Sequence, residues 1–182
     1  MSKKQESQCP LTQLATVDPE SLPSGTSQDL TFKYIDISAV LNGRLLIPNE
    51  ETPLRDAPSR ARRILRNGDV IISTVRPNLK AFAYCELPDS DFVASTGFSI
   101  LRAKENADAR FILYALLSDD VTKQINQLVV GSNYPAINSS DVKRLLLPKF
   151  SPKKQRKIGT ILSTIDRAIA HTEALIEKYH QI

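Results

Sequence analysis

The chain's only histidines, His171 and His180, are nine residues apart in the C-terminal segment. That spacing is too long for a joint metal-ligand pair on one helix. Neither lies in the part of the chain expected to be globular, so no Cys-His or Ser-His-Asp set is expected. The carboxylate pairs Glu50-Glu51 and Asp119-Asp120 lie in polar surroundings without neighbouring metal-ligand residues. We interpret them as solvated, and we expect neither a catalytic site nor a metal site.

Nucleotide-binding signatures are also missing. The sequence contains no GxxxxGK[ST] loop, and no GxGxxG follows a predicted strand. The string SNYP at 132–135 superficially resembles an amino-methyltransferase loop, but its order is wrong and the glycine loop for S-adenosylmethionine is missing. Two cysteines, Cys9 and Cys85, cannot form a Cys-rich zinc site, and we expect both to be reduced thiols. This inventory favours a binding protein without cofactors.

A cluster of arginines is the feature of the sequence that points to a function. Residues 55–80 carry seven basic and two acidic residues, a local charge of +5 against +4 for the whole chain. Arginine forms bidentate contacts with guanine edges and phosphates, and asparagine can read adenine. The alternative to DNA binding is that these arginines form a solvated basic face without a ligand. The predicted DNA-binding residues are Arg55, Arg60, Arg62, Arg63, Arg76, Asn78, Lys80, Ser132, Asn133 and Tyr134.

The C-terminal segment predicts one long helix. All eleven prolines precede residue 153, Ser151 suits an N-cap, and Pro152 suits the first helical position. The helix would run about 28 residues, or roughly 42 Å. Its first turns carry Lys153, Lys154, Arg156 and Lys157, where the helix dipole is already positive. This end is expected to meet phosphate or an acidic protein surface, unless it is simply a solvated basic end.

Apolar residues recur along this helix at alternating steps of four and three. A period of 3.5 residues favours packing against another helix, in a homodimer or with a partner, over packing on the chain's own domain. Thr172 weakens the seam and could fix its register. The predicted dimer interface consists of Ile158, Leu162, Ile165, Ile169, Thr172, Ile176 and Tyr179.

The remaining pattern predicts an α+β fold in two parts, a domain over 1–150 with a mixed or antiparallel sheet and peripheral helices, and the coiled-coil helix over 151–182. Residues 1–29 are expected to be irregular, anchored by Leu11, Leu14 and Val17. The predicted strands cover 30–43, 69–76, 80–87, 92–103 and 145–150, the last an edge strand. Within 92–103, Gly97 is expected to mark a bulge or a close backbone approach. Helices are expected after an Asp108 cap and over about 121–128, and loops over 48–60 and 131–138.

The longest apolar run, Phe111 to Leu117, has seven residues, whereas a membrane span needs about 20. The basic N-terminus is not followed by an apolar stretch, so we expect no secretory signal. These features predict a cytoplasmic protein without a membrane partner.

Six strings in order make the chain resemble the specificity subunit of type I restriction-modification systems. They are YIDISAV, PSRARR, GDVIISTVRPNLK, ASTGFSILRAK, GSNYPAIN and LLLPKFSPKKQRKIGTILSTIDRAIAHTEALI, and the match covers about residues 30–182. Each string is weak alone, while their order and spacing together are specific. Members of this family carry two target-recognition domains, each followed by a long helix, and the two helices pair antiparallel. This sequence is similar to half of such a subunit.

The resemblance implies a non-catalytic reader of double-stranded DNA, with adenine methylation and cleavage performed by modification and restriction subunits. It also implies that the helix region docks the modification subunit. The half-subunit would self-associate and read a bipartite site; alternatively, the sequence is a fragment of a longer chain. Two other functions stay open, a coiled-coil adaptor that binds a protein without DNA and a nuclease with a scattered site.

Overall fold

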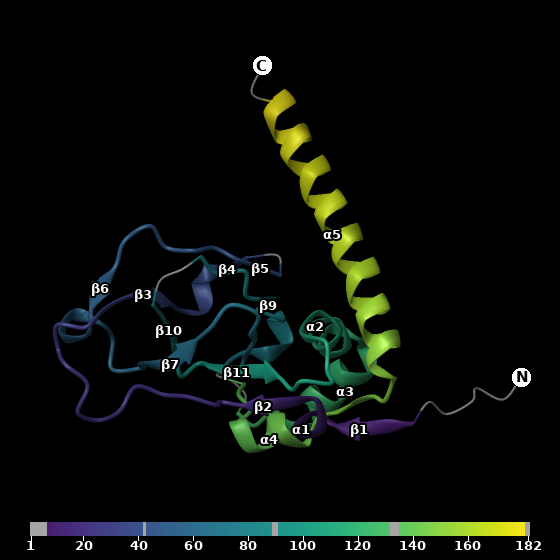
Figure 1. Cartoon of the computed structure of the whole chain (residues 1–182), viewed down its shortest axis with the longest axis horizontal. Coiled ribbons are helices and arrows are strands. Elements are labelled where there is room, and N and C mark those ends of the chain that lie inside the picture. Colours follow the sequence, from purple (N-terminus) through teal and green to yellow (C-terminus); the bar gives the residue numbers. More distant parts are fainter. Residues whose placement is uncertain (1–6, 42, 89–90, 132–134, 181–182) are drawn as a thin grey trace, which may run out of the picture.

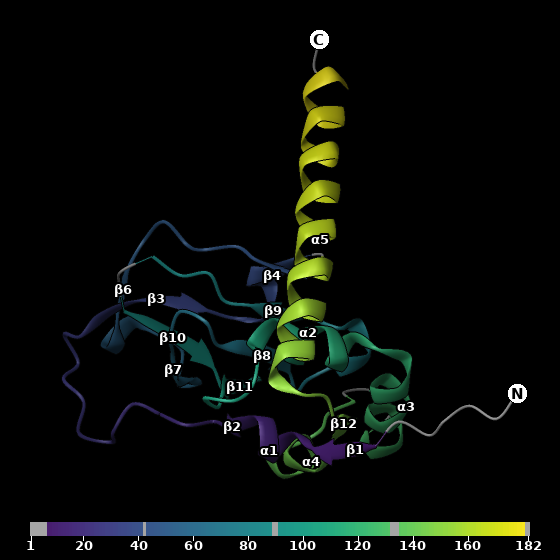
Figure 2. The same cartoon turned by 45° about the vertical axis from the view of Figure 1, so that its right-hand side comes forward.

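The computed structural model describes residues 7–41, 43–88, 91–131 and 135–180. Figures 1 and 2 show a mixed head, built from the described residues up to 150, and one helix, α5 (Pro152–His180), that extends away from it. The predicted α+β class with a long C-terminal helix is confirmed. Within the described ranges, no helix is long and apolar enough to cross a membrane.

An antiparallel sheet lies beside helix α2 in the larger part of the core. Its strands, in order, are β2 (Ala15–Val17), β11 (Phe98–Ala103), β8 (Val70–Ser73) and β9 (Phe82–Tyr84). Side chains of this sheet pack with α2 (Ala109–Leu117), and their burial stabilises the fold by about 1.5–3 kcal/mol for each large apolar residue. The predicted strands over 69–76 and 80–87 are confirmed as the β8–β9 pair.

A second, mixed sheet forms the end of the head farther from α2 (Figure 1). Its order is β6 (Thr52–Pro53), β3 (Thr31–Ile35), β10 (Phe92–Ser95) and β7 (Ala61–Leu65). β10 pairs parallel with β3 and antiparallel with β7. β7 was not predicted from the sequence. Its two buried ends, Ala61 and Leu65, are separated by two adjacent arginines that interrupt the apolar pattern of a strand.

The single strand predicted over 92–103 is wrong. β10 and β11 belong to different sheets, and the chain turns between them at Thr96 and Gly97. A Cβ at Gly97 would lie 3.1 Å from Ile37 Cδ1, so the glycine permits a close approach at this corner. All four residues of β10 and the first four of β11 are buried, so the residues on both sides of Thr96 and Gly97 resemble parts of one buried strand.

The strand predicted over 30–43 is also shorter than expected. β3 ends at Ile35, and Asp36 caps a short 3-10 helix, η1 (Ile37–Ala39), by accepting a hydrogen bond of 2.9 Å from Ser38 N. β4 (Val40–Leu41) then pairs with β5 (Arg44–Leu45). The predicted 48–60 loop contains β6 and a second 3-10 helix, η2 (Leu54–Asp56).

The N-terminal segment is more ordered than predicted. β1 (Gln8–Pro10) pairs antiparallel with β12 (Leu146–Pro148), which lies within the predicted 145–150 edge strand, and α1 (Leu11–Leu14) follows β1. The expected anchors Leu11, Leu14 and Val17 are buried. The pairing was not foreseen because the two strands are distant in sequence, and only the fold brings them together.

The helices begin near the residues that their caps predict. Asp108 accepts a hydrogen bond of 2.8 Å from Phe111 N and caps α2, as expected. Ser118 caps α3 (Asp119–Leu128), and Asn138 caps α4 (Ser139–Arg144). At α5, Ser151 Oγ accepts from Lys154 N at 3.4 Å, and Pro152 is the first helical residue. The predicted start of the long helix is confirmed.

Candidate nucleic-acid interface

Two predicted DNA-contacting arginines, Arg60 and Arg62, lie exposed at the start of β7. The backbone places them there, because Arg60 O accepts a hydrogen bond of 2.9 Å from Thr96 N in the turn between the two sheets. Arg62 Nε donates to Ser59 O at 3.3 Å. Both residues therefore lie next to the corner at which β10 ends and β11 begins.

The turn between β8 and β9 adds Arg76 and Asn78, both exposed. Arg76 and Lys80 have φ values of 48° and 51° and flank the 3-10 helix η3 (Pro77–Leu79). A left-handed backbone is unusual for residues other than glycine and costs of order 1–3 kcal/mol. A hydrogen bond of 2.7 Å from Arg76 N to Pro135 O helps to hold it. Lys80 turns toward the head, because its Nζ donates to Leu117 O at 3.1 Å.

Backbone hydrogen bonds join these segments into one continuous surface. Thr74 N donates to Gly97 O at 2.8 Å, and Ile137 N donates to Thr74 O at 2.9 Å. We name the resulting surface the recognition edge and define it by its exposed polar residues, Arg60, Arg62, Thr96, Arg76 and Asn78. Thr96 was not among the predicted DNA-binding residues; its position beside Gly97, between two strand-like segments, was the signal that could have revealed it.

The loop prediction at 132–134 falls outside the described residues, so Ser132, Asn133 and Tyr134 have no structural account. The described residues that flank the loop, Val130 and Ala136, exchange two hydrogen bonds of 3.1 Å. Ala136 also pairs with Val75, next to Arg76. Val130 and Ala136 therefore lie beside the recognition edge.

Two other predicted DNA-binding arginines are bound to the head's own carboxylates. Arg63 lies 3.2 Å from Asp18, and its side chain is only 21% exposed. Arg55 pairs with Asp29. It lies in η2 and is not one of the residues that define the recognition edge. The structure therefore divides the basic stretch of the sequence: Arg60, Arg62 and Arg76 line one edge, while Arg63 joins β7 to the N-terminal segment.

A buried ion pair joins the other ends of β8 and β11. Arg102 donates two hydrogen bonds of 2.9 Å to Asp69, whose side chain is 2% exposed, and it also binds Glu20. These hydrogen bonds to Asp69 raise the pKa of Arg102, against the opposing effect of burial. Glu20 also pairs with Arg66. The network fixes the segment around Glu20 against the ends of β7 and β11 that lie opposite the recognition edge.

Helix α5 presents a different kind of surface. Of the predicted dimer-interface residues, Ile158 is half-buried and packs against the head's core, and Leu162 is also half-buried. Beyond them the apolar side chains are exposed, at 49% for Ile165 and 53% for Ile176, for example. We name this surface the exposed stripe; it consists of Ile161, Ile165, Ile169, Thr172, Leu175, Ile176 and Tyr179. Ile161 and Leu175 were not part of the predicted seam.

Among the described residues, no group of three or more His, Cys, Asp or Glu side chains is arranged to hold a metal ion. Cys9 and Cys85 are both buried and free. Burial raises the pKa of both thiols. The arrangement is suited to contacts with a charged polymer along one edge and with an apolar helix along α5.

A head of mixed sheets followed by one long helix matches a known family. A family model described as "Type I restriction modification DNA specificity domain" matches residues 22–179. The chain belongs to this family. Among relatives of the specificity domain, the specificity subunit of the type I restriction enzyme HindI from Haemophilus influenzae is 24% identical over 152 residues. That match covers 82% of this chain and 33% of the relative.

Solved structures agree with this assignment. The crystal structure of the HsdS subunit from Thermoanaerobacter tengcongensis superposes with a TM-score of 0.78 at 32% identity, covering 94% of this chain and 45% of that one. A chain from a study of complex assembly and conformational transition of the type I R-M system gives a TM-score of 0.77 at 30% identity, covering 95% and 45%. The chain thus spans about a third of the curated relative and less than half of each solved chain.

Proposed function

We propose that this chain is a non-catalytic DNA-reading subunit of a type I restriction-modification complex, in which the head reads one half-site and α5 joins two heads. The observation that carries the proposal is that backbone hydrogen bonds bring the segments of Arg60, Arg62 and Arg76, all exposed, to one corner of the head. Guanidinium groups serve both phosphate and guanine recognition, and Asn78 on the same turn could pair with adenine. The alternative of an adaptor without DNA leaves this convergence unexplained.

Self-association is the second part of the proposal. Six large apolar side chains of α5, together with Thr172, are exposed along one face, and an unpartnered apolar face of this length on a soluble head favours burial against a second helix. An antiparallel pair with two-fold symmetry would place the two heads at opposite ends of the helices. Protein symmetry is mirrored in the DNA, so the site would consist of two inverted half-sites around an unread spacer.

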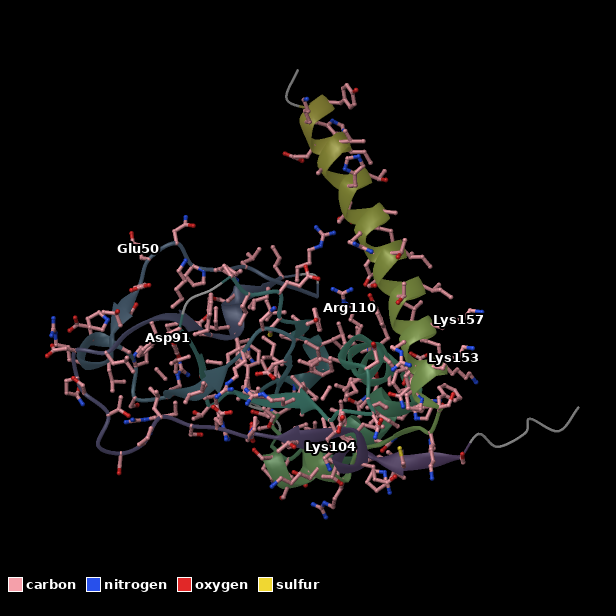
Figure 3. All side chains as sticks on the ribbon, in the orientation of Figure 1. Glu50, Asp91, Lys104, Arg110, Lys153 and Lys157 are labelled. Atoms are coloured by element: carbon pink, nitrogen blue, oxygen red, sulfur yellow. The ribbon has the colours of Figure 1, made fainter. Side chains whose placement is uncertain are left out.

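The third part of the proposal concerns the other subunits of the complex. We propose that a modification subunit, and with it a restriction subunit, supplies methylation and cleavage in the cytoplasm. Figure 3 shows Lys153 and Lys157 projecting from α5 on the side away from the head. With Lys154 and Arg156, also exposed, they form a basic surface at the start of α5 that suits an acidic surface of the modification subunit.

The test is selection of binding sites from randomised duplex DNA by the full chain, alone and with the modification subunit. The expected result is an enriched bipartite inverted repeat, with retention that weakens as salt rises. Retention that lacks salt dependence, together with no enriched sequence, would reject the DNA-reading function in favour of the adaptor. Magnesium-dependent cleavage by the purified chain would instead indicate a nuclease.

A further inference from the structure

The base of α5 is attached to the head by a buried polar side chain. Gln155 is 2% exposed. Its side-chain oxygen accepts a hydrogen bond of 3.1 Å from Asp108 N, and its side-chain nitrogen donates to Phe150 O at 2.9 Å. The first turn of α5 is thereby tied both to the start of α2 and to the segment that precedes α5.

One turn farther on, Gly159 brings α5 into direct contact with α2. A Cβ at this position would lie 2.4 Å from Asp108 Oδ1 and 3.1 Å from Phe111 N. Those two atoms form the hydrogen bond that caps α2. A larger residue at position 159 would therefore have to push the two helices apart or break the cap.

A third attachment lies two turns above Gly159. Tyr114, on α2, donates a hydrogen bond of 2.7 Å from its hydroxyl to Asp166 on α5. Burial and this hydrogen bond to the carboxylate raise the pKa of Tyr114. Arg44, on the β4–β5 hairpin, lies 3.5 Å from Glu173, still higher on α5. A helix held at several levels along one side cannot tilt about its base without breaking one of these contacts.

The attached side of α5 differs from the exposed stripe. At 100° per residue, the direction of Gln155, Gly159 and Asp166 lies about 120° around the helix axis from the direction of Ile161, Ile165 and Thr172. Figures 1 and 2 show α2 beside the first turns of α5 only, with the rest of the helix clear of it. The head and a second helix can therefore both contact α5, and the attachment stays in place when the stripe is covered.

We propose that Tyr114 and Gly159 are positioning residues that set the length of the spacer between the two half-sites. This inference rests on the proposed function of two heads joined through α5. A head of ~150 residues has a radius of about 20 Å. Because α5 lies at one side of the head (Figure 1), turning the head by about 5° on α5 moves its far edge, about 40 Å away, by roughly 3.5 Å, which is one base-pair step. The rigidity of this joint thus decides whether one spacer length or several can be read.

The experiment compares the wild type and three variants of the full chain on duplexes that carry the selected half-sites at every spacing from about 3 to 12 base pairs. Tyr114→Phe removes only the hydroxyl that binds Asp166. Tyr34→Phe is the matched control, because the Tyr34 hydroxyl is buried without a hydrogen-bond partner among the described residues. Gly159→Ala is the second variant, since it displaces the helices directly. Thermal melting shows whether each variant folds.

The wild type and Tyr34→Phe should prefer one spacing over its neighbours by about tenfold, and Tyr114→Phe should reduce that preference to about threefold or less without changing the half-site sequence. Gly159→Ala should broaden or shift the preferred spacing further. A preference that stays sharp in both variants would overturn the inference and leave the proposed function intact. If the wild type selects only a single half-site, the bipartite function and the inference fail together.

Discussion

The carboxylate of Asp69 accepts two hydrogen bonds of 2.9 Å from the guanidinium group of Arg102, inside a head in which Asp69 is almost fully buried. Asp69 also accepts from Arg66 N at 2.9 Å, so one side chain connects the turn after β7 with β11. The pair therefore ties β8, β11 and the turn after β7 together at the end of the sheet opposite the recognition edge.

Replacing one partner of this pair should destabilise the head strongly. Asp69→Asn leaves Arg102 without its main counter-charge, and removing one member of a buried pair costs about 3–5 kcal/mol. Urea unfolding measures the loss. Arg144→Ala is the control, because Arg144 is 69% exposed beside Asp141 and such surface pairs contribute about 1 kcal/mol or less. Equal losses in the two variants would contradict the bracing role of Asp69.

Arg76 allows stability to be separated from DNA contact. Arg76→Gly should change stability by no more than about 1 kcal/mol, because glycine adopts the left-handed backbone without strain and this relief offsets the loss of the side chain's own contacts. The same variant should bind the selected DNA more weakly, since it lacks the guanidinium group. Chemical unfolding and a binding titration measure the two effects. A glycine variant that keeps its affinity would remove Arg76 from the contact surface.

Arg62 should contribute to the salt dependence of binding. A phosphate contact adds about one unit to the slope of log K against log salt concentration, so Arg62→Ala should lower the slope by roughly that amount. Lys123→Ala serves as the control, because Lys123 is an exposed cation on α3 paired with Asp120 at 3.8 Å. If both variants change the slope equally, the effect of Arg62 comes from net charge alone.

The exposed stripe predicts the behaviour of two substitutions on α5. Ile165→Glu combined with Ile176→Glu places four carboxylates in the proposed interface of a dimer. The dissociation constant should rise by at least about 100-fold, given about 1.5–3 kcal/mol for each buried isoleucine that is lost. Sedimentation equilibrium measures it. Thr160→Glu, at an exposed position off the stripe, should leave the dimer unchanged; a monomeric wild type would refute the interface.

Tyr114 predicts a pH dependence. Its pKa in the folded protein is raised above the ordinary value of about 10 by burial and by the hydrogen bond to Asp166, so the unfolded chain ionises first. The stabilisation from this hydroxyl is therefore complete below pH ~10 and declines as the pH rises toward the folded pKa. Tyrosinate absorbance should reveal one late-titrating tyrosine that Tyr114→Phe lacks. A difference curve centred at or below pH ~10 would contradict the burial of this hydroxyl.

Local signals account for the features that the sequence by itself determined. The Ser151 cap, Pro152 and the repeating apolar steps specify where α5 begins and which of its faces is apolar, because caps and helical periodicity act within a few residues. The Asp108 cap fixes the start of α2 in the same way. Six ordered strings carried the family resemblance, and the concentration of arginines in residues 55–80 marked the basic region of the head.

Tertiary structure alone decided which of those basic residues share an edge. Arg62 and Arg63 are neighbours in sequence, yet one is exposed and the other lies against Asp18, because the partner carboxylate comes from a distant segment. Likewise, the strand break at Gly97 depends on two sheets that meet there, and Ile158 is covered because α2 lies beside it. Contacts between residues far apart in the chain leave no local pattern, so only the folded arrangement can show them.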